Sequence, residues 1–259
     1  MTGFLASVNS LEEARIALAG GADVIDLKEP ARGVLGAVPL ATIREVVNFV
    51  AERRLVSATV GDMPADPAMV GPAVEETWAS GVDLVKVGFF EPVNHHPLLN
   101  TLAIQAHKGT RIVAVLFADR ELDFTMVRHL VDCGVAGVML DTAEKQSRSL
   151  RNYRTDEELL AFVEVVKALG LMVGLAGSLA IDDITPLLPL KPDYLGFRGA
   201  LCVKNQREKQ MDPEAVHNVR KRIPSGPSKL YVPVIKTERK PAGFDLEEYS
   251  YDAVANQES

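Results

Sequence analysis

The sequence predicts a single (β/α)₈ barrel of the TIM type. The chain has 259 residues, of which 47% are apolar. That is enough for one large core, and barrels of this kind routinely reach this length. Short apolar runs alternate with longer segments of helical period, and glycine or Asn/Asp turn signals separate them. Near-continuous apolar strands joined by helices predict a parallel sheet covered on both faces, and eight such units predict a closed barrel.

The predicted strands and helices alternate along the chain. The strands are apolar runs over 3–8, 24–28, 55–60, 84–89, 111–117, 137–141, 171–176 and 194–199. Apolar positions of helical period fill the intervals over 11–19, 40–51, 68–79, 96–107, 123–132, 155–169, 181–188 and 213–222. The turn after the first strand has no glycine-rich fingerprint. This disfavours the structural alternative, an open doubly wound sheet that binds a nucleotide at that turn.

Three helix starts carry capping signals. Ser10 and Thr155 each stand three residues before a glutamate, in the order of a capping box, and Asp212 precedes a proline at the first helical position. Helices are therefore expected to begin directly after these three residues.

The barrel is predicted to span 1–224, followed by a C-terminal extension over 225–259 that departs from the alternating pattern. The extension has two interpretations, a disordered tail or a segment that packs on a second copy of the chain in a homo-oligomer. No apolar stretch approaches the roughly 18 residues of a membrane span, and the N-terminus lacks the basic region of a signal peptide. A cytoplasmic protein with no membrane partner is expected.

Charge and cysteine content argue against some classes of ligand. The net charge of −7 argues against nucleic acid as a partner, because binding to phosphate backbones needs a basic face. A local cluster of lysines can still hold a small anion within about one Debye length. Cys133 and Cys202 lack metal-ligand spacing, so no metal site is predicted.

The candidate catalytic residues begin with Asp26 and Lys28. Residues i and i+2 of a strand share a face, and a lysine held among apolar groups beside a carboxylate can act as an amine nucleophile that forms a Schiff base. The pattern of glycine, strand and ionisable group recurs, and it adds Lys86, Asp141 and Lys145. Chemistry in such barrels lies at the carboxyl ends of the strands, so all five groups are expected to converge there.

Two further aspartates, Asp62 and Asp119, follow the third and fifth strands on the same rim. Both are interpreted as turn or cap residues, because each opens a turn-like sequence.

The loops after the last two strands predict a phosphate site, which barrels often build there from backbone amides and the start of a short helix. The candidate residues are Gly174, Gly177, Ser178, Gly196, Arg198 and Gly199. Arg32, just after Lys28, is a candidate for a second phosphate, with a solvated loop arginine as the alternative. The residues together predict imine chemistry on a phosphorylated carbonyl compound. No cofactor is expected, because the imine itself serves as the electron sink.

Five segments carry a resemblance to a known family, and they extend over about the first 200 residues: SVNSLEEAR, GGADVIDLKEPARGVLGA, LVKVGF, MLDTAEK and GLAGSL. They resemble the (5-formylfuran-3-yl)methyl phosphate synthases, also called 4-(hydroxymethyl)-2-furancarboxaldehyde-phosphate synthases. The resemblance implies condensation of two molecules of glyceraldehyde 3-phosphate, with loss of phosphate and water, to a furan precursor of methanofuran or methylofuran. It implies that Lys28 is the Schiff-base lysine and Asp26 its partner. Lys86, Asp141 and Lys145 would be acid/base or phosphate-orienting groups.

Two rival functions stay open from the sequence. One is a class I aldolase-type barrel that acts on other triose or sugar phosphates with the same imine lysine. The other is a barrel that binds a phosphorylated metabolite without catalysis and uses its lysines only to hold the anion. Product identity separates the first rival, and borohydride trapping of an imine separates the second.

Overall fold

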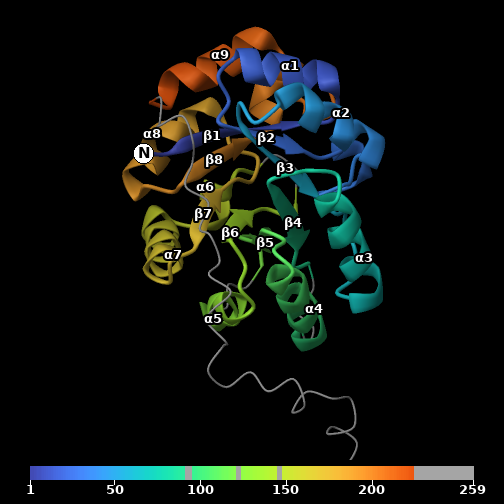
Figure 1. The fold of residues 1–259 in the computed structure, drawn as a ribbon. Coiled ribbons are helices and arrows are strands. Elements are labelled where there is room, and N and C mark those ends of the chain that lie inside the picture. Colours follow the sequence, from blue (N-terminus) through green and yellow to red (C-terminus); the bar gives the residue numbers. More distant parts are fainter. Residues whose placement is uncertain (91–94, 121–123, 145–147, 225–259) are drawn as a thin grey trace, which may run out of the picture.

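A closed barrel of parallel strands, surrounded by helices, forms the computed structural model of the chain (Figure 1). The structure describes residues 1–90, 95–120, 124–144 and 148–224. Within these ranges the strands follow one another around the barrel in chain order, and β8 closes it against β1. They are β1 (Gly3–Val8), β2 (Val24–Leu27), β3 (Leu55–Thr59), β4 (Leu84–Gly88), β5 (Ile112–Phe117), β6 (Gly137–Asp141), β7 (Met172–Leu175) and β8 (Tyr194–Phe197). The predicted (β/α)₈ fold is confirmed.

Helices cover the outside of the barrel, and α1 and α9 lie together at the top of Figure 1. The α-helices of the described ranges are α1 (Leu11–Ala19), α2 (Leu40–Val50), α3 (Pro67–Trp78), α4 (His96–His107), α5 (Phe124–Asp132), α6 (Leu150–Tyr153), α7 (Asp156–Ala168), α8 (Ile184–Leu187) and α9 (Pro213–Arg222). Short 3₁₀ helices occupy Pro30–Arg32, Ile181–Asp183, Leu188–Leu190, Gly199–Leu201 and Val203–Asn205. The predicted extension over 225–259 lies outside the described residues.

The predicted caps have two outcomes. Thr155 forms a complete capping box, because its hydroxyl accepts from the Glu158 N–H at 3.3 Å and its own N–H donates to the Glu158 carboxylate at 2.8 Å. Asp212 caps α9 through the Glu214 N–H. Ser10 caps α1, but its box is incomplete because the Glu13 carboxylate accepts from the Asn9 N–H instead.

The prediction of one continuous helix over 181–188 was wrong. This segment is broken into the 3₁₀ turn Ile181–Asp183, the single turn of α8 and the start of a second 3₁₀ turn. Pro186 and Pro189 explain the break, because neither residue has an N–H to donate to a helical hydrogen bond. The segment therefore leaves an irregular wall beside the ends of β7 and β8.

The core has two layers, as the alternation of side chains in a strand requires. Strand residues that point outward pack against the helices in a large buried cluster. Residues that point inward fill the barrel with a second cluster that includes Leu5, Val113, Met139, Met172 and Tyr194. Towards the carboxyl ends of the strands, the inward positions become polar.

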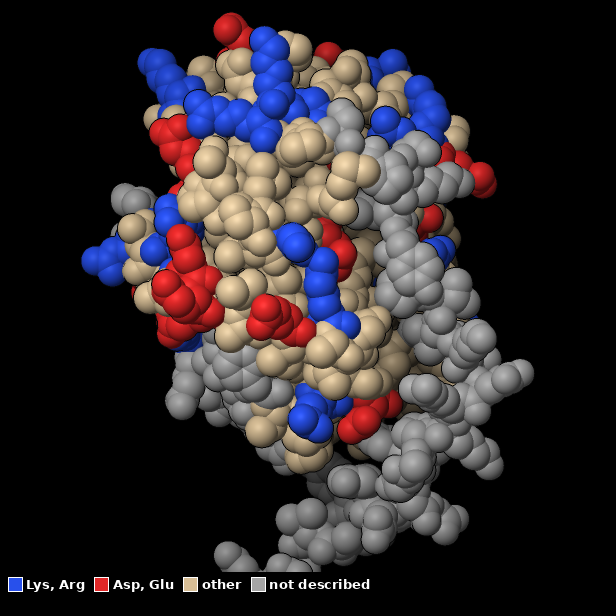
Figure 2. All heavy atoms as spheres, turned by 90° about the vertical axis from the view of Figure 1, so that its left-hand side faces the viewer, with Lys and Arg blue, Asp and Glu red and all other residues tan. Residues whose placement is uncertain are grey.

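Basic and acidic side chains are interspersed on the face of the molecule seen in Figure 2, and basic residues gather at its upper edge. Helix α9, which lies at the top of Figure 1, carries Arg220, Lys221 and Arg222 in its last turn. The helices in the described part of the chain are all too short or too polar to cross a lipid bilayer.

Candidate active site

Four of the five predicted catalytic residues converge at the carboxyl ends of the strands. Asp26 lies on β2, Lys28 directly follows that strand, Lys86 lies on β4 and Asp141 ends β6. Each of these side chains is buried. Lys145 falls outside the described residues, so its role stays a prediction.

Asp26 is the centre of a buried hydrogen-bond network. Parallel pairing places Ser7 of β1, Asp26 of β2 and Ser57 of β3 in register, so their side chains share the inner face of the barrel. The Asp26 carboxylate accepts from Ser7 Oγ at 3.0 Å, from Ser57 Oγ at 2.6 Å and from Lys86 Nζ at 2.8 Å. Asp26 is therefore fixed in position from three neighbouring elements.

Burial by itself would raise the pKa of the Asp26 carboxyl. The positive charges of Lys86 and Lys28, together with hydrogen bonds from Lys86 and Ser57, outweigh burial and hold this pKa below its ordinary value. Asp26 is thus a carboxylate at neutral pH, and its negative charge faces both lysines.

Lys28 and Asp141 form a second, looser pair. Lys28 Nζ lies 4.0 Å from Asp141 Oδ2. Both residues are anchored by hydrogen bonds. The Lys28 N–H donates to the Val8 carbonyl at 2.9 Å, and the carboxylate oxygen Asp141 Oδ1 accepts from the Thr142 N–H at 2.7 Å. Because β2 and β6 lie far apart in the strand order, this pair spans the mouth of the barrel.

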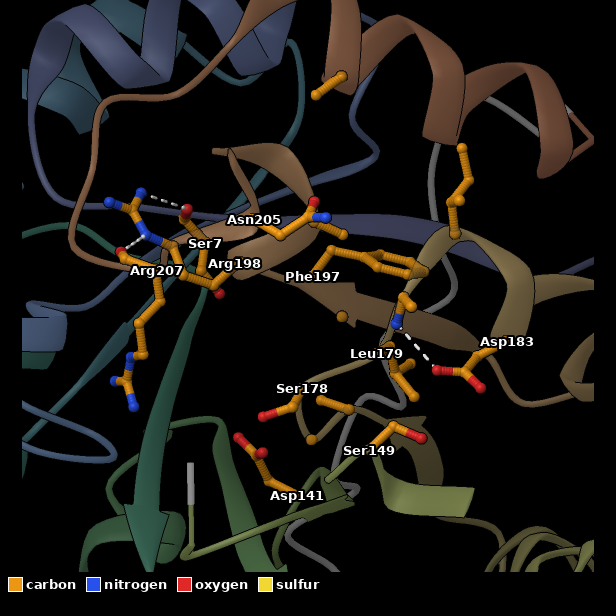
Figure 3. A pocket seen from close by; sticks show the side chains of 18 of the residues that line it. Ser7, Asp141, Ser149, Ser178, Leu179, Asp183, Phe197, Arg198, Asn205 and Arg207 are labelled. Atoms are coloured by element: carbon orange, nitrogen blue, oxygen red, sulfur yellow. Dashed lines mark hydrogen bonds between the residues drawn. The ribbon is translucent and has the colours of Figure 1, made fainter. Parts of the chain in front are cut away.

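A pocket of about 770 Å³ opens beside this pair. Its walls come from the ends of β1, β6, β7 and β8 and from the segments around α6, α8 and α9. Lys28 and Asp141 line it, whereas Asp26 lies two residues earlier on β2 and deeper in the barrel. Figure 3 shows Asp141 and Ser178 pointing into the pocket. The Lys28 side chain therefore borders a space large enough for a small molecule.

The predicted phosphate residues of the β7 loop separate into two groups. Gly177 and Ser178 line the pocket and have positive φ angles of 108° and 48°. A Cβ on Gly177 would lie 2.7 Å from Thr142 Cγ2, so the tight turn requires glycine. Gly174 instead faces the Tyr194 ring, which a Cβ would meet at 2.3 Å. Gly174 therefore packs against Tyr194 inside the barrel.

The predicted residues of the β8 loop, Gly196, Arg198 and Gly199, all line the pocket. The Arg198 guanidinium, however, forms a buried ion pair with Glu13 of α1 through both carboxylate oxygens. It also donates to the carbonyls of Ser7, Arg207 and Lys209. All three guanidinium nitrogens thus have protein acceptors. This arrangement provides no direct support for the predicted phosphate contact of Arg198.

Arg32 lies at the end of the 3₁₀ turn Pro30–Arg32 and is exposed. It does not belong to the part of the described chain that lines the pocket. Its predicted contact with a second phosphate stays untested.

Asp62 and Asp119 were interpreted as turn or cap residues, but their carboxylates bond to the backbone of other loops rather than to a turn or helix start of their own. Asp62, after β3, accepts from the N–H groups of Val34 and Leu35 at 2.7 and 2.6 Å. Asp119, after β5, accepts from the N–H groups of Ala143 and Glu144 at 2.8 and 2.7 Å. The first loop follows Lys28 and the second follows Asp141, so the two aspartates stabilise the surroundings of the looser pair.

The sequence reasoning missed several residues of the site. Ser7 and Ser57 are polar residues at inward positions of apolar strands, and this alternation could have marked them. Tyr194 lies inside the barrel, where burial and the negative charges of Asp26, Asp193 and Asp141 raise its pKa, so its phenol stays protonated. Arg207 lines the pocket from the loop after β8, and no strand pattern marked that loop. Within the described residues, His, Cys, Asp and Glu side chains form no group of three suited to hold a metal ion.

Comparison with known proteins supplies the family. Residues 4–220 match the family described as 4-HFC-P synthase. The chain belongs to the 4-HFC-P synthase family. A relative from Methylorubrum extorquens is 38% identical over 223 residues, which cover 86% of this chain and 92% of the relative. The (5-formylfuran-3-yl)methyl phosphate synthase of Methanothermobacter thermautotrophicus is 35% identical, over 78% of this chain and 90% of its own length.

Among solved structures, phosphoribosyl anthranilate isomerase from Thermus thermophilus has a TM-score of 0.62 to this chain at 17% identity. The alignment covers 86% of this chain and 98% of the isomerase. At this identity the likeness supports the barrel fold alone. The 4-HFC-P synthase relatives are named synthases, so this chain is an enzyme by its family membership.

Proposed function

We propose that this 4-HFC-P synthase family member condenses two molecules of glyceraldehyde 3-phosphate into (5-formylfuran-3-yl)methyl phosphate through a Schiff base on Lys28. The product would be a furan precursor of methanofuran or methylofuran. Two triose phosphates contain all the atoms of this product plus one phosphate and two waters, so the reaction needs no oxidant or reductant. The relatives' name supports the product, because it specifies a formyl group and a phosphate ester.

The observation that carries the proposal is the position of Lys28. Its side chain is buried, yet it lines a pocket and lies 4.0 Å from a carboxylate. The other lysine that is buried in the described part of the chain, Lys86, is bonded to Asp26 at 2.8 Å and is 1% exposed. An amine nucleophile must reach its carbonyl carbon, so access favours Lys28 over Lys86 as the imine-forming residue.

The remaining groups have roles that follow from their positions. The Lys28 amine attacks the aldehyde carbon of one triose phosphate, and loss of water gives the imine. Asp141 is the carboxylate nearest to this centre along the pocket wall, so we assign to it the removal of the proton that converts the imine to an enamine. The enamine carbon then bonds to the carbonyl carbon of the second triose. Phosphate elimination, ring closure and dehydration complete the furan, and hydrolysis of the imine frees Lys28.

Asp26 acts deeper in the barrel. Its negative charge balances the positive charge of Lys86 within a network that Ser7 and Ser57 complete. Lys86 is absent from the described residues that line the pocket. We propose that the network orients Lys28 electrostatically and that neither Asp26 nor Lys86 bonds covalently to substrate.

Product analysis tests the proposal. The purified full chain is incubated with glyceraldehyde 3-phosphate without added metal or cofactor, and the reaction is followed by ultraviolet absorbance, phosphate release and mass spectrometry. A furan aldehyde phosphate formed together with phosphate is the expected result. A six-carbon sugar phosphate would identify the aldolase rival. Unchanged substrate would reject the proposed reaction.

Reductive trapping locates the imine. Borohydride added during turnover should attach the triose to the peptide that contains Lys28 and leave the Lys86 peptide unmodified. A label on Lys86, or the absence of any covalent adduct, would reject the assigned role of Lys28.

A further inference from the structure

Arg207 has an unusual position at the mouth of the pocket. It lies in the loop after β8, is half-buried and lines the pocket together with Lys28 and Asp141. Its Nη2 atom donates to the Gly33 carbonyl at 2.8 Å. Gly33 belongs to the loop that follows Lys28, so Arg207 connects the loop after β8 to the loop after β2.

The Arg207 guanidinium retains hydrogen-bonding capacity. Nε and Nη1 donate to no acceptor among the described residues. Burial lowers the pKa of Arg207 from its ordinary value, and the negative charges of Asp141, Glu208 and Asp62 oppose this shift. A guanidinium stays protonated at neutral pH in proteins. Arg207 therefore presents a cation with available N–H groups to the pocket.

Arg198 provides the contrast within the same loop. Its guanidinium is bonded to Glu13 and to three backbone carbonyls, and one of these is the carbonyl of Arg207 at 2.7 Å. In Figure 3 the two guanidinium groups point in different directions, and that of Arg207 points into the pocket. Arg198 thus fixes the backbone from which Arg207 extends.

We propose that Arg207 binds the phosphate group of the triose phosphate held at Lys28, and that Arg198 positions Arg207 for this contact. The identity of the substrate rests on the proposed function above. A planar guanidinium fork matches two oxygens of a phosphate, and this geometry is stronger and more directional than a single ammonium contact. The contact would select phosphorylated aldehydes over aldehydes that lack phosphate.

Binding of glycerol 3-phosphate tests Arg207 separately from the chemistry. This probe has the phosphate of the substrate and no carbonyl, so it cannot form an imine. Isothermal titration calorimetry on the full chain is expected to show that Arg207→Met weakens binding roughly 10- to 100-fold, the loss of one or two charge-assisted hydrogen bonds. Arg207→Lys should bind with intermediate affinity, because it keeps the charge and loses the fork.

Lys209→Met is the matched control. It removes one positive charge from the same loop, at an exposed side chain outside the pocket lining. Its affinity for glycerol 3-phosphate should stay within about twofold of that of the unmodified chain, because exposed charges are screened. Thermal unfolding of each variant confirms that it is folded before titration.

Trapping at Lys28 gives the second readout. With cyanoborohydride, Arg207→Met should lose yield with glyceraldehyde 3-phosphate and keep the yield with glyceraldehyde. An equal loss with both aldehydes, equal calorimetric affinity of Arg207→Met and the unmodified chain, or no binding of glycerol 3-phosphate by the unmodified chain would each overturn the assignment. Phosphate binding that depends on Arg207 without any imine would instead reject the proposed function and keep this inference.

Discussion

Two lysine–aspartate pairs occupy the same barrel, and they differ in distance and in access. The Lys86–Asp26 pair is closed at 2.8 Å, and its side chains are 1% and 0% exposed. The Lys28–Asp141 pair is open at 4.0 Å, with side chains that are 7% and 2% exposed. Two serines complete the closed pair, whereas a pocket adjoins the open one.

The difference shows that two pairs of the same residue types can have different roles, one in stability and one in the proposed chemistry. Breaking a closed, buried ion pair leaves an uncompensated charge in a medium of low dielectric constant, so the closed pair resists change. An open pair beside a pocket leaves room for a substrate atom. The comparison therefore predicts that substitutions in the open pair reduce turnover, and that substitutions in the closed pair also reduce stability.

The largest expected effect is on turnover, in Lys28→Arg. This change keeps the positive charge and removes the imine-forming amine, so turnover should fall by about 1,000-fold or more while the unfolding temperature changes little. Assays of product formation measure turnover, and thermal melts measure the unfolding temperature. Lys108→Arg, at an exposed lysine of the C-cap of α4, is the control for the substitution type. Near-normal turnover of Lys28→Arg would remove the distinction between the pairs.

The second effect is on stability, in Lys86→Met. Removing this partner leaves the Asp26 carboxylate buried and uncompensated, which should cost about 3–5 kcal/mol of unfolding free energy. Denaturant titration measures the loss. The double variant Lys86→Met/Asp26→Asn should recover part of it, because the uncompensated charge is gone. A single variant as stable as the unmodified chain would show that the closed pair has no structural role.

A smaller effect is expected for Ser57→Ala. The Ser57 hydroxyl donates to Asp26 at 2.6 Å, and losing one hydrogen bond to a buried charged group should cost about 1–3 kcal/mol. Ser80→Ala serves as the control, since the Ser80 hydroxyl bonds only a helical carbonyl, that of Glu76. Equal losses of unfolding free energy in both variants would mean that the bond from Ser57 to Asp26 stabilises the protein no more than an ordinary hydroxyl–carbonyl bond.

The last prediction concerns the loss of stability at acid pH, an effect that is absent at neutral pH. Because the folded pKa of Asp26 is lowered from 3.8, its contribution is fully present above the unfolded pKa and is lost as pH falls below about 3.8 through the folded value. Denaturant titrations from neutral to acid pH should therefore show a shallower acid loss in Asp26→Asn than in the unmodified chain. Parallel curves would contradict the lowered pKa.

The sequence was sufficient for the barrel and for the convergence of Asp26, Lys28, Lys86 and Asp141. Apolar runs mark buried strands, and the fold rule places their carboxyl ends together. The sequence was insufficient to predict the hydrogen-bond partners of these side chains. The strand register decides that Ser7 and Ser57 flank Asp26, and no local pattern encodes it.

Arginine roles were harder still to predict. Arg198 follows a strand end, as a phosphate ligand would, but Glu13 takes its guanidinium from 185 residues away in the chain. Arg207 lies in an irregular loop with no periodicity to read. Local sequence gives the position of such a side chain, and only the closed tertiary structure gives its partner.

The Glu13–Arg198 ion pair also has a consequence for synthesis of the protein. Glu13 leaves the ribosome long before Arg198, and this pair joins α1 to the loop after β8, next to the seam where β8 closes on β1. During translation the early strands must wait with an open edge until the last strand emerges. The pocket is therefore completed only after β8 and the loop that follows it have been synthesised, and a nascent chain that stops before β8 would have Lys28 without that part of the pocket wall.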